Sequence, residues 1–522
     1  MLATTSGSFR PAGNLDSRTA LLPYRGAWNA RRAAHLLRRA GFGGSPAEVA
    51  QFAALSMDAA VDRLIRFPDT SRLAQAPQLV EDHPPRRAPN AMLASPAMQP
   101  APGTSDPLGI ANQMGTAPAQ MAPAPVPPPA LTADQIKALG KAHFDNAVAM
   151  MQWWIGRMVA TPAPLQEKMT LFWHGHFTSA YEGKGISAQD IFAQNQLFRS
   201  YALGNIRQLT LAVSHDPAML KYLDNRANRA QHPNENYARE LMELFTLGIG
   251  NYTENDVRES ARAFTGYTLD ANDQFVFNPR MHDNGSKTFL GRTGNFTGDD
   301  IVGIIFQQPV AAQYFARKLL EFYVYDDPEP QLIDGVAGLL RSHDFEVGPV
   351  MSALLRSNVF HSDRAYRALV KSPTEFIVGT YKLLQMPPDG VDQPALGAMT
   401  RMGQRLFFPP NVKGWDGGAA WLNSGTLLTR ENFAGGMCVN PQMMQNATWL
   451  AQSATLDPKL LAAHISDHVL QGDISPASRA KLEQYLSGAD AAALGMLSGE
   501  NLDERIRGAV YLAMATPAYQ LA

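Results

Sequence analysis

The feature that most constrains the fold is a proline-rich segment at residues 74–131, which holds more than a third of the chain's 37 prolines. Proline removes a backbone hydrogen-bond donor, and this segment has few large apolar side chains that could be buried. We therefore predict a long, disordered Pro/Ala-rich insertion. A solvated linker is the simplest role for it, and a proline-rich docking site for a partner is the alternative.

Outside this segment the sequence is typical of helices. A capping box is predicted at Ser45, where the Ser45 side chain and the Glu48 side chain bond each other's backbone N–H groups. Further helix starts are predicted at Thr132, Thr253 and Ser372. We predict a mainly α protein with a multi-helix globular body. Its parts are a flexible N-terminus (1–28), an N-terminal helical unit (29–73), the insertion (74–131), a main helical body with the candidate site (132–440) and a C-terminal helical region (441–522).

Two stretches depart from the helical pattern. Between Gly266 and Gly291, short aromatic runs surround turn-forming Asp, Asn and Gly residues, which indicates one small β-hairpin. The stretch from Arg405 to Trp421 combines prolines and glycines with aromatic residues. We expect it to form an ordered but irregular loop.

Composition and charge exclude several classes of protein. Hydrophobic residues make up 45% and charged residues 18%, as in soluble globular proteins with a large core. A net charge of −2 gives no strong field for nucleic acid or an anionic membrane surface. No apolar run could span a membrane and no secretory signal is visible, so we expect a cytoplasmic protein. With Cys438 as the only cysteine, a cysteine-built zinc site cannot form.

Half of the 12 histidines lie between residues 143 and 282, and the sharpest local motif among them is His174-Gly-His176. In an extended or helix-terminal backbone, this spacing points both imidazoles to one side, as a metal pair requires. Aromatic neighbours would make the surroundings dry. The alternative is a pair of histidines at the edge of the core, hydrogen-bonded to carbonyl groups.

An acidic helix is predicted at residues 233–247. Its helical period places Tyr237 and Leu241 on the buried stripe and Glu240 and Glu243 at its border. A carboxylate at such a border is paired, binds a cation, or acts as a general acid or base with a raised pKa. Pairing of Glu240 and Glu243 with arginines such as Arg258 or Arg262 is the structural alternative. Arg239 can contact a substrate or form an outer ion pair with Glu235.

Two further motifs supply candidate site residues. His282 and Asp283 are neighbours at the predicted hairpin. His282 could be a metal ligand supported by the Asp283 carboxylate, or a base that this carboxylate orients. Alternatively, both are simply turn residues. Lys413 and Trp415 belong to the irregular loop, which could close over a polar ligand. Packing is the simpler role for Trp415.

These motifs, in this order, resemble the bacterial family known as domain of unknown function 1800, over nearly the whole chain apart from the insertion. The resemblance implies little about activity. It does imply that members are often exported, and that a sulfatase-like protein of family 1501, often encoded by a neighbouring gene, is a candidate partner. The matching segments are AAHLLRRAGFG (33–43), FWHGHF (172–177), HPNENYARELMELFTLG (232–248), FTGYT (264–268), HDNGSKTFLG (282–291), KSPTEF (371–376), FPPNVKGWDGG (408–418) and LAMATPAYQ (512–520).

The motifs lead to a first functional hypothesis, a metal-dependent enzyme of the hydrolase or oxidoreductase type. A divalent transition metal such as zinc, iron, manganese or copper would activate water or polarise a substrate oxygen. Its residues would be the ligands His174, His176, Glu240 and His282, the catalytic Glu240, Glu243 and Asp283, and the substrate-binding Arg239, Lys413 and Trp415.

Two other hypotheses stay open at this point. In one, the chain is a non-catalytic helical scaffold or accessory protein that binds a partner protein or a polysaccharide through the 405–421 loop, and its histidines form a buried hydrogen-bond network. In the other, a metal-free hydrolase uses Glu240 as an acid with Glu243 or Asp283 as its partner.

Overall fold

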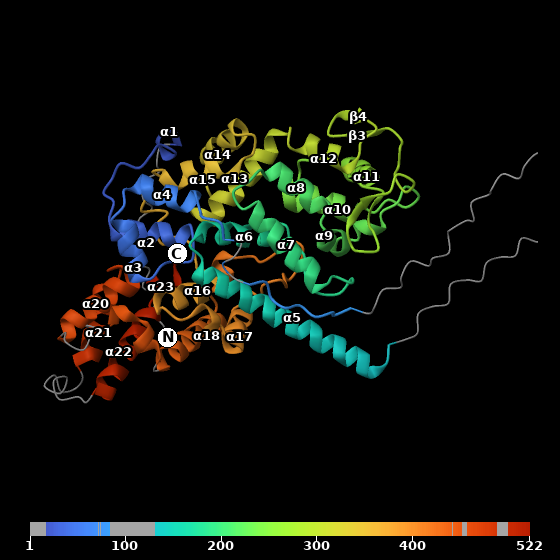
Figure 1. The fold of residues 1–522 in the computed structure, drawn as a ribbon. Helices are drawn as coiled ribbons and strands as arrows, with labels where there is room; N and C mark the ends of the chain where they lie inside the picture. Colours follow the sequence, from blue (N-terminus) through green and yellow to red (C-terminus); the bar gives the residue numbers. More distant parts are fainter. Residues whose placement is uncertain are drawn as a thin grey trace, which may run out of the picture.

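The computed structural model describes residues 17–70, 73, 75–83, 131–440, 442–450, 457–487 and 499–522. This part of the chain is mainly helical, as predicted, and carries two small two-stranded sheets. Residues 84–130 of the predicted insertion and residues 1–16 of the predicted N-terminus lie outside the described residues. In Figure 1 one group of helices forms the upper part of the molecule and another forms the lower part, with α6 between them.

Local sequence signals explain where several helices begin. The capping box predicted at Ser45 is present, and the helix starts predicted at Thr132 and Ser372 are confirmed. All three residues form capping boxes directly before the first residue of a helix. In each box both reciprocal hydrogen bonds form, so two of the unpaired N–H groups at the helix start are satisfied.

The upper part contains the N-terminal helices and most helices of the middle of the chain (Figure 1). They are α1 (Ser17–Ala20), α2 (Ala30–Arg39), α3 (Pro46–Ala53), α4 (Met57–Ile65), α8 (Ile206–Ser214), α9 (Pro217–Tyr222), the 3-10 helix η1 (Asn225–Ala227), α10 (Glu235–Glu240), the π-helix η2 (Leu241–Thr246), α11 (Glu254–Ala263), α12 (Gly298–Ile305), α13 (Pro309–Tyr323), α14 (Pro330–Ser342) and α15 (Val347–Arg356).

The lower part contains the long helix α5 and the helices of the last third of the chain, while α6 (Pro164–His176) and α7 (Ala188–Ser200) lie near the middle (Figure 1). The lower helices are α5 (Ala133–Ala160), α16 (Pro373–Leu383), α17 (Gln393–Arg401), α18 (Ser424–Val439), α19 (Gln442–Asn446), α20 (Pro458–Leu470), α21 (Pro476–Ser487), α22 (Gly499–Met514) and α23 (Pro517–Gln520), with the 3-10 helices η3 (Pro388–Gly390), η4 (Gly418–Trp421) and η5 (Thr448–Leu450).

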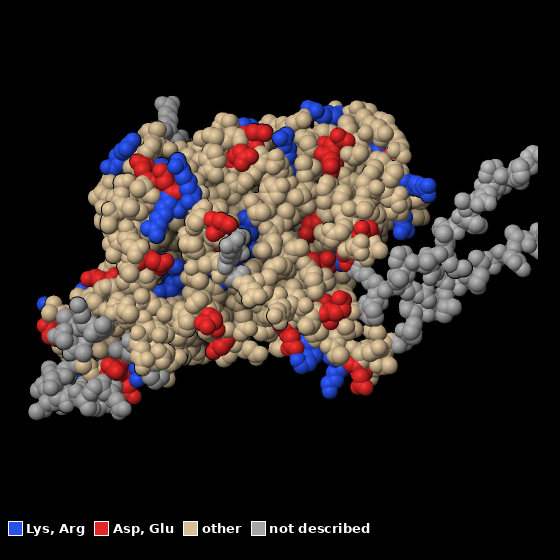
Figure 2. Space-filling model, in the orientation of Figure 1, with Lys and Arg blue, Asp and Glu red and all other residues tan. Residues whose placement is uncertain are grey.

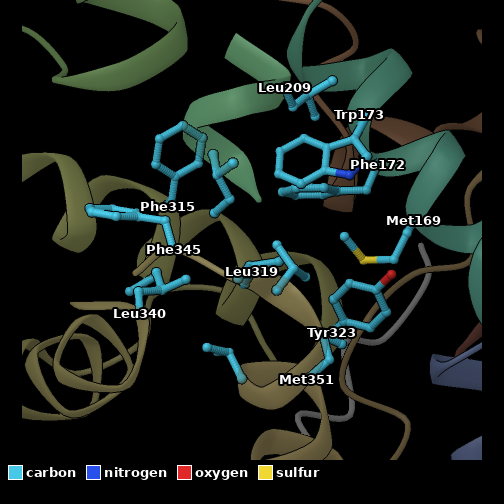
Figure 3. Packing of buried hydrophobic residues seen from close by; sticks show 14 of the residues in the cluster. Met169, Phe172, Trp173, Leu209, Phe315, Leu319, Tyr323, Leu340, Phe345 and Met351 are labelled. Carbon is cyan, nitrogen blue, oxygen red and sulfur yellow. The ribbon is translucent and has the colours of Figure 1, made fainter. Parts of the chain in front are cut away.

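Two clusters of buried hydrophobic residues hold these parts together, and α6 contributes to both. Met169, Phe172 and Trp173 belong to the first cluster, where they pack near Phe315 and Leu319 of α13 (Figure 3). Leu171, one residue before Phe172, belongs to the second cluster instead. A helix that buries side chains all round its circumference must lie inside the protein, and α6 occupies that position.

The predicted single β-hairpin is two hairpins. β1 (Tyr267–Leu269) pairs with β2 (Phe275–Phe277), and β3 (Lys287–Phe289) pairs with β4 (Arg292–Gly294), both antiparallel. The second turn consists of Leu290 and Gly291, both with positive φ, which is the two-residue turn that matches the twist of a hairpin. The sequence pattern indicated the turns but did not separate the two pairs of strands.

Charged side chains of both signs are scattered in small groups over the visible face, and neither sign forms a continuous field (Figure 2). This distribution agrees with the net charge of −2. Within the described part of the chain, no helix has both the length and the apolar character that crossing a bilayer requires.

Candidate functional site

The two histidines of the first motif lie in the last turn of α6 and point to opposite sides of it. His174 contacts Trp154 of α5, together with Phe407 and Trp415 of the irregular loop. His176 contacts the other side of the helix, at η2 and α13. Side chains two residues apart in a helix are separated by about 200°, so the same-side arrangement expected for an extended backbone does not occur.

His174 forms a hydrogen bond with a backbone group. Its Nε2 accepts the N–H of Phe407 at 3.1 Å. The residue is only 2% exposed, and burial lowers the pKa of its imidazole to about 3. His174 is therefore neutral at neutral pH, and its Nε2 lone pair is occupied.

His176 forms a similar bond on the other side of α6. Its Nε2 donates to the carbonyl oxygen of Phe245 at 2.9 Å. Burial, with a smaller effect from the charge of Lys318, lowers the pKa of His176 to about 3. The ring therefore joins the end of α6 to η2, the element that also carries Glu243.

The predicted acidic helix changes its geometry at Glu240. It is α-helical through Glu240 and continues as a π-helix, in which the N–H of Leu247 donates to the carbonyl of Met242. Tyr237 and Leu241 are buried, as the helical period predicts. A π-helical turn is rare and often occurs at functional sites.

The two carboxylates of this helix differ in their partners. Glu243 accepts a hydrogen bond from the Tyr252 hydroxyl at 2.9 Å. Glu240 has no hydrogen-bond partner among the described residues, and burial followed by the charge of Glu243 raises its pKa. The arginines considered as partners bond elsewhere, since Arg258 contacts Asn255 and Arg262 contacts Glu259.

His282 and Asp283 are held by the segment just before β1. His282 Nδ1 donates to the Thr265 carbonyl at 2.8 Å. Asp283 pairs with both Nε and Nη2 of Arg262, at 2.7 and 3.1 Å, and these bonds lower the pKa of its carboxyl group. Asp283 also accepts the N–H of Gly285, which is the turn role considered from the sequence.

The three predicted substrate-binding residues lie in different surroundings. Arg239 pairs with both carboxylate oxygens of Glu254, each at 2.8 Å, and with Glu235 at 3.2 Å. Lys413 pairs with Asp416 on the exposed part of the loop. Trp415 is half-buried, with its ring 5.5 Å from that of His174.

The structure does not gather the four predicted ligands around one point. Among the described residues, one group of three or more His, Cys, Asp or Glu side chains has its ligand atoms within 4.8 Å of one another, and it consists of Glu81, Asp82 and His83. The predicted ligands come from a helix end, a helix border and a hairpin loop, and each imidazole among them bonds the backbone of a different segment.

A different group of polar residues surrounds a cavity between the two hydrophobic clusters. Ala34 and Val49 of the first cluster line one part of it, and Phe42 and Leu383 of the second line another. Its polar lining consists of Arg38 from α2, Arg367 and Lys371 from the segment before α16, Glu375 from α16, Gln471 after α20 and Tyr519 from α23.

The positive charges of this cavity exceed the available negative charges. Arg367 donates to Asp473 at 3.0 Å and to the Leu470 carbonyl at 2.8 Å. Arg38 is 7% exposed, bonds Gln471 through Nη1 and lies 5.4 Å from the centre of the Tyr366 ring, while its Nε and Nη2 are buried without a hydrogen-bond partner. Burial followed by the charge of Arg367 lowers the pKa of Arg38 to about 10.

Lys371 is the second cation of the cavity lining, after Arg38, that forms no ion pair with a carboxylate of the described residues. It is 8% exposed, and its Nζ lies 3.8 Å from the centre of the Tyr519 ring, a cation–π contact. Burial, then the charges of Arg367 and Arg38, lower its pKa well below the usual value. The nearby carboxylate of Glu375 bonds Lys168 and the N–H of Ser372.

Sequence reasoning did not single out this cavity. Arg38 and Lys371 belong to two of the family-like segments, AAHLLRRAGFG and KSPTEF, but arginine and lysine side chains usually face solvent. The available signal was the pair of arginines Arg38 and Arg39, which follow the apolar Leu36 and Leu37 at the end of α2. Both are buried.

Fold and cavity together define a mainly helical protein with buried cations at the junction of two hydrophobic clusters. The chain belongs to the family described as protein of unknown function (DUF1800), which matches residues 35–521 and confirms the resemblance of the motifs. No curated protein and no solved structure matches the chain.

Proposed function

We propose that this protein binds a small anionic ligand, through a carboxylate or phosphate group, in the cavity lined by Arg38 and Lys371. The observation that carries the proposal is the pair of unpartnered, buried guanidinium nitrogens of Arg38, Nε and Nη2. Burying a charged group whose N–H donors lack acceptors costs free energy, and a bound oxyanion would reduce this cost by accepting hydrogen bonds from them.

The chemistry of the lining favours an oxyanion over a neutral ligand. The planar guanidinium group of arginine matches the paired oxygens of a carboxylate or phosphate, and a lysine adds a point charge beside it. The cavity has a volume of about 40 Å³, where a single water needs about 10–15 Å³. This space suits the oxyanion group of a ligand.

The proposal departs from the metal enzyme considered from the sequence. The bonds of His174, His176 and His282 to backbone groups favour the structural network of the scaffold hypothesis for these residues. The aromatic loop gives little support to polysaccharide binding, because Phe407 and Trp421 are buried. Binding of an anion is therefore the function that the contacts support best.

Calorimetric titration of the full chain with inorganic phosphate, and separately with acetate, tests the proposal at constant ionic strength. We expect saturable binding of at least one of the two anions. Arg38→Met and Lys371→Met should each weaken it by at least about tenfold, because a charge-assisted hydrogen bond contributes about 1.5–3 kcal/mol. The control is Arg258→Met, which removes one exposed positive charge that does not line the cavity.

Two results would contradict the proposal. One is the absence of saturable binding for both anions. The other is equal binding by the unmutated protein and the Arg38→Met variant, with far-UV circular dichroism showing that the variant is folded. If only acetate or only phosphate binds, the result identifies the anionic group of the ligand.

A further inference from the structure

A second polar cluster lies where the segment before residue 84 meets α5. Residues 75–83 have no regular secondary structure, but two hydrogen bonds between the Val80 backbone and the Asn146 side chain attach them to the helical body. The N–H of Val80 donates to Asn146 Oδ1 at 3.0 Å, and Asn146 Nδ2 donates back to the Val80 carbonyl at 2.9 Å. Asn146 is buried in α5, so these bonds fix the segment to the helical body at Val80.

Asp82 is at the centre of the cluster, and its side chain is fully buried. Its Oδ1 lies 2.6 Å from Nδ1 of His83, and its Oδ2 accepts a hydrogen bond from the Tyr181 hydroxyl. Both carboxylate oxygens are thus held in place by side chains from different parts of the chain. A buried carboxylate with fixed oxygens is a suitable ligand for a cation.

Two imidazoles lie on either side of this carboxylate. His83 Nδ1 contacts one oxygen, and His143 Nδ1 lies 3.8 Å from the other. The ring of His143 stacks on that of Tyr181, with centroids 4.0 Å apart, and this contact orients the imidazole. The cluster therefore combines residues of the 75–83 segment with His143 of α5 and Tyr181 after α6.

We propose that Glu81, Asp82 and His83, with His143 as a fourth ligand, bind a divalent transition-metal ion. Ligand atoms of the first three lie within 4.8 Å of one another. In a tetrahedral site with bonds of about 2.0–2.2 Å, neighbouring ligand atoms are about 3.3–3.6 Å apart. The His83–Asp82 and His143–Asp82 separations of 2.6 and 3.8 Å lie on either side of that value. His143 lies outside the group within 4.8 Å, so a metal ion would replace the His83–Asp82 hydrogen bond and draw the His143 imidazole inward by a side-chain rotation.

The donor set indicates which class of metal fits. Two imidazoles and two carboxylates suit zinc, iron or manganese, whereas calcium and magnesium prefer oxygen ligands alone. The two carboxylates also neutralise the charge of a divalent ion. Tyr181 would act as a positioning residue, because its hydroxyl orients Asp82 and does not itself belong to the ligand set.

The experiment uses the full chain, purified without a histidine tag, treated with a chelator and titrated with Zn²⁺ by calorimetry. We expect one equivalent of Zn²⁺ to bind. His83→Ala and Asp82→Asn should weaken binding by at least about tenfold, and Tyr181→Phe should have a smaller effect. Replacement of Zn²⁺ by Co²⁺ should give the visible absorption of a tetrahedral site, and His143→Gln should change that spectrum.

His343→Ala is the matched control, because His343 is exposed and lies outside the cluster. The proposal is overturned if the unmutated protein binds no stoichiometric Zn²⁺, or if His83→Ala binds it as tightly as the control does. Thermal unfolding without metal checks that each variant is folded. If His83→Ala does not fold, the Co²⁺ spectrum of the His143→Gln variant decides, since an unchanged spectrum contradicts the ligand set.

Discussion

The backbone N–H of Phe407 donates a hydrogen bond to Nε2 of His174 over 3.1 Å. A backbone N–H is always the donor, so Nε2 must be the unprotonated nitrogen of the ring. The bond connects the end of α6, deep between the two hydrophobic clusters, to the irregular loop at 405–421. We infer that His174 acts in this protein as a structural link between α6 and the loop.

Replacing His174 should therefore destabilise the fold. In His174→Ala the N–H of Phe407 stays buried without an acceptor and the imidazole leaves a void. We expect the free energy of unfolding to fall by about 2–4 kcal/mol. Urea denaturation measures this change, with His343→Ala as an exposed control. A loss below about 0.5 kcal/mol, as at an ordinary surface site, would contradict the structural role.

The buried histidines should also make stability depend on pH. Burial lowers the pKa of both His174 and His176 to about 3 in the folded protein, from the usual 6.5. The unfolded chain therefore binds more protons at intermediate pH. The contribution of these two histidines to the free energy of unfolding is complete above about pH 6.5 and is lost as the pH falls towards 3. The loss is up to about 1.4 kcal/mol per pH unit for each imidazole.

Urea denaturation at about pH 7 and about pH 5 checks this dependence through a comparison with His176→Gln. The variant lacks one titrating ring, so its stability should decrease less on acidification than that of the unmutated protein. The comparison cancels the contributions of other groups, such as Asp216, whose pKa burial raises to about 7. Equal decreases in both proteins would show that His176 does not titrate as the structure indicates.

Gly414 should be intolerant of any side chain. Its φ is +87°, and an added Cβ would lie 2.6 Å from the carbonyl oxygen of Gly175 in α6. We expect Gly414→Ala to lower the free energy of unfolding by at least about 2 kcal/mol. Gly140→Ala is the control, because Gly140 is exposed in the first half of α5 and an added Cβ there meets nothing within 4 Å. This substitution should stabilise the protein by up to about 1 kcal/mol.

Two arginines of the cationic cavity should respond in opposite ways to substitution by methionine. Without added anion, Arg38→Met removes a buried charge that lacks a carboxylate partner, so the free energy of unfolding should stay equal or rise. Arg367→Met breaks the pair with Asp473 and should lower it by about 3 kcal/mol. Denaturation in chloride buffer measures both. A large loss in Arg38→Met would indicate that the protein itself compensates this charge.

The sequence predicted the features that depend on neighbouring residues. The helix starts predicted at Ser45, Thr132 and Ser372 were correct because the capping bonds at each join residues three apart. The burial of Tyr237 and Leu241 followed from helical period. The separation into two hairpins and the π-helix after Glu240 were not predicted, because packing against distant segments selects these geometries over others that the same local pattern allows.

By itself, then, the sequence determined the helical class, the positions of many helix starts and membership of the family. Only the tertiary structure decided which polar side chains lie together. His174 and His176 are close in sequence but face opposite sides of one helix, whereas Arg38 and Lys371 are distant in sequence and line one cavity. The reason is physical, because the hydrogen bonds of caps and turns join residues that are a few positions apart in the sequence. Burial of the hydrophobic faces of the helices, in contrast, brings together side chains from distant segments where the helices pack.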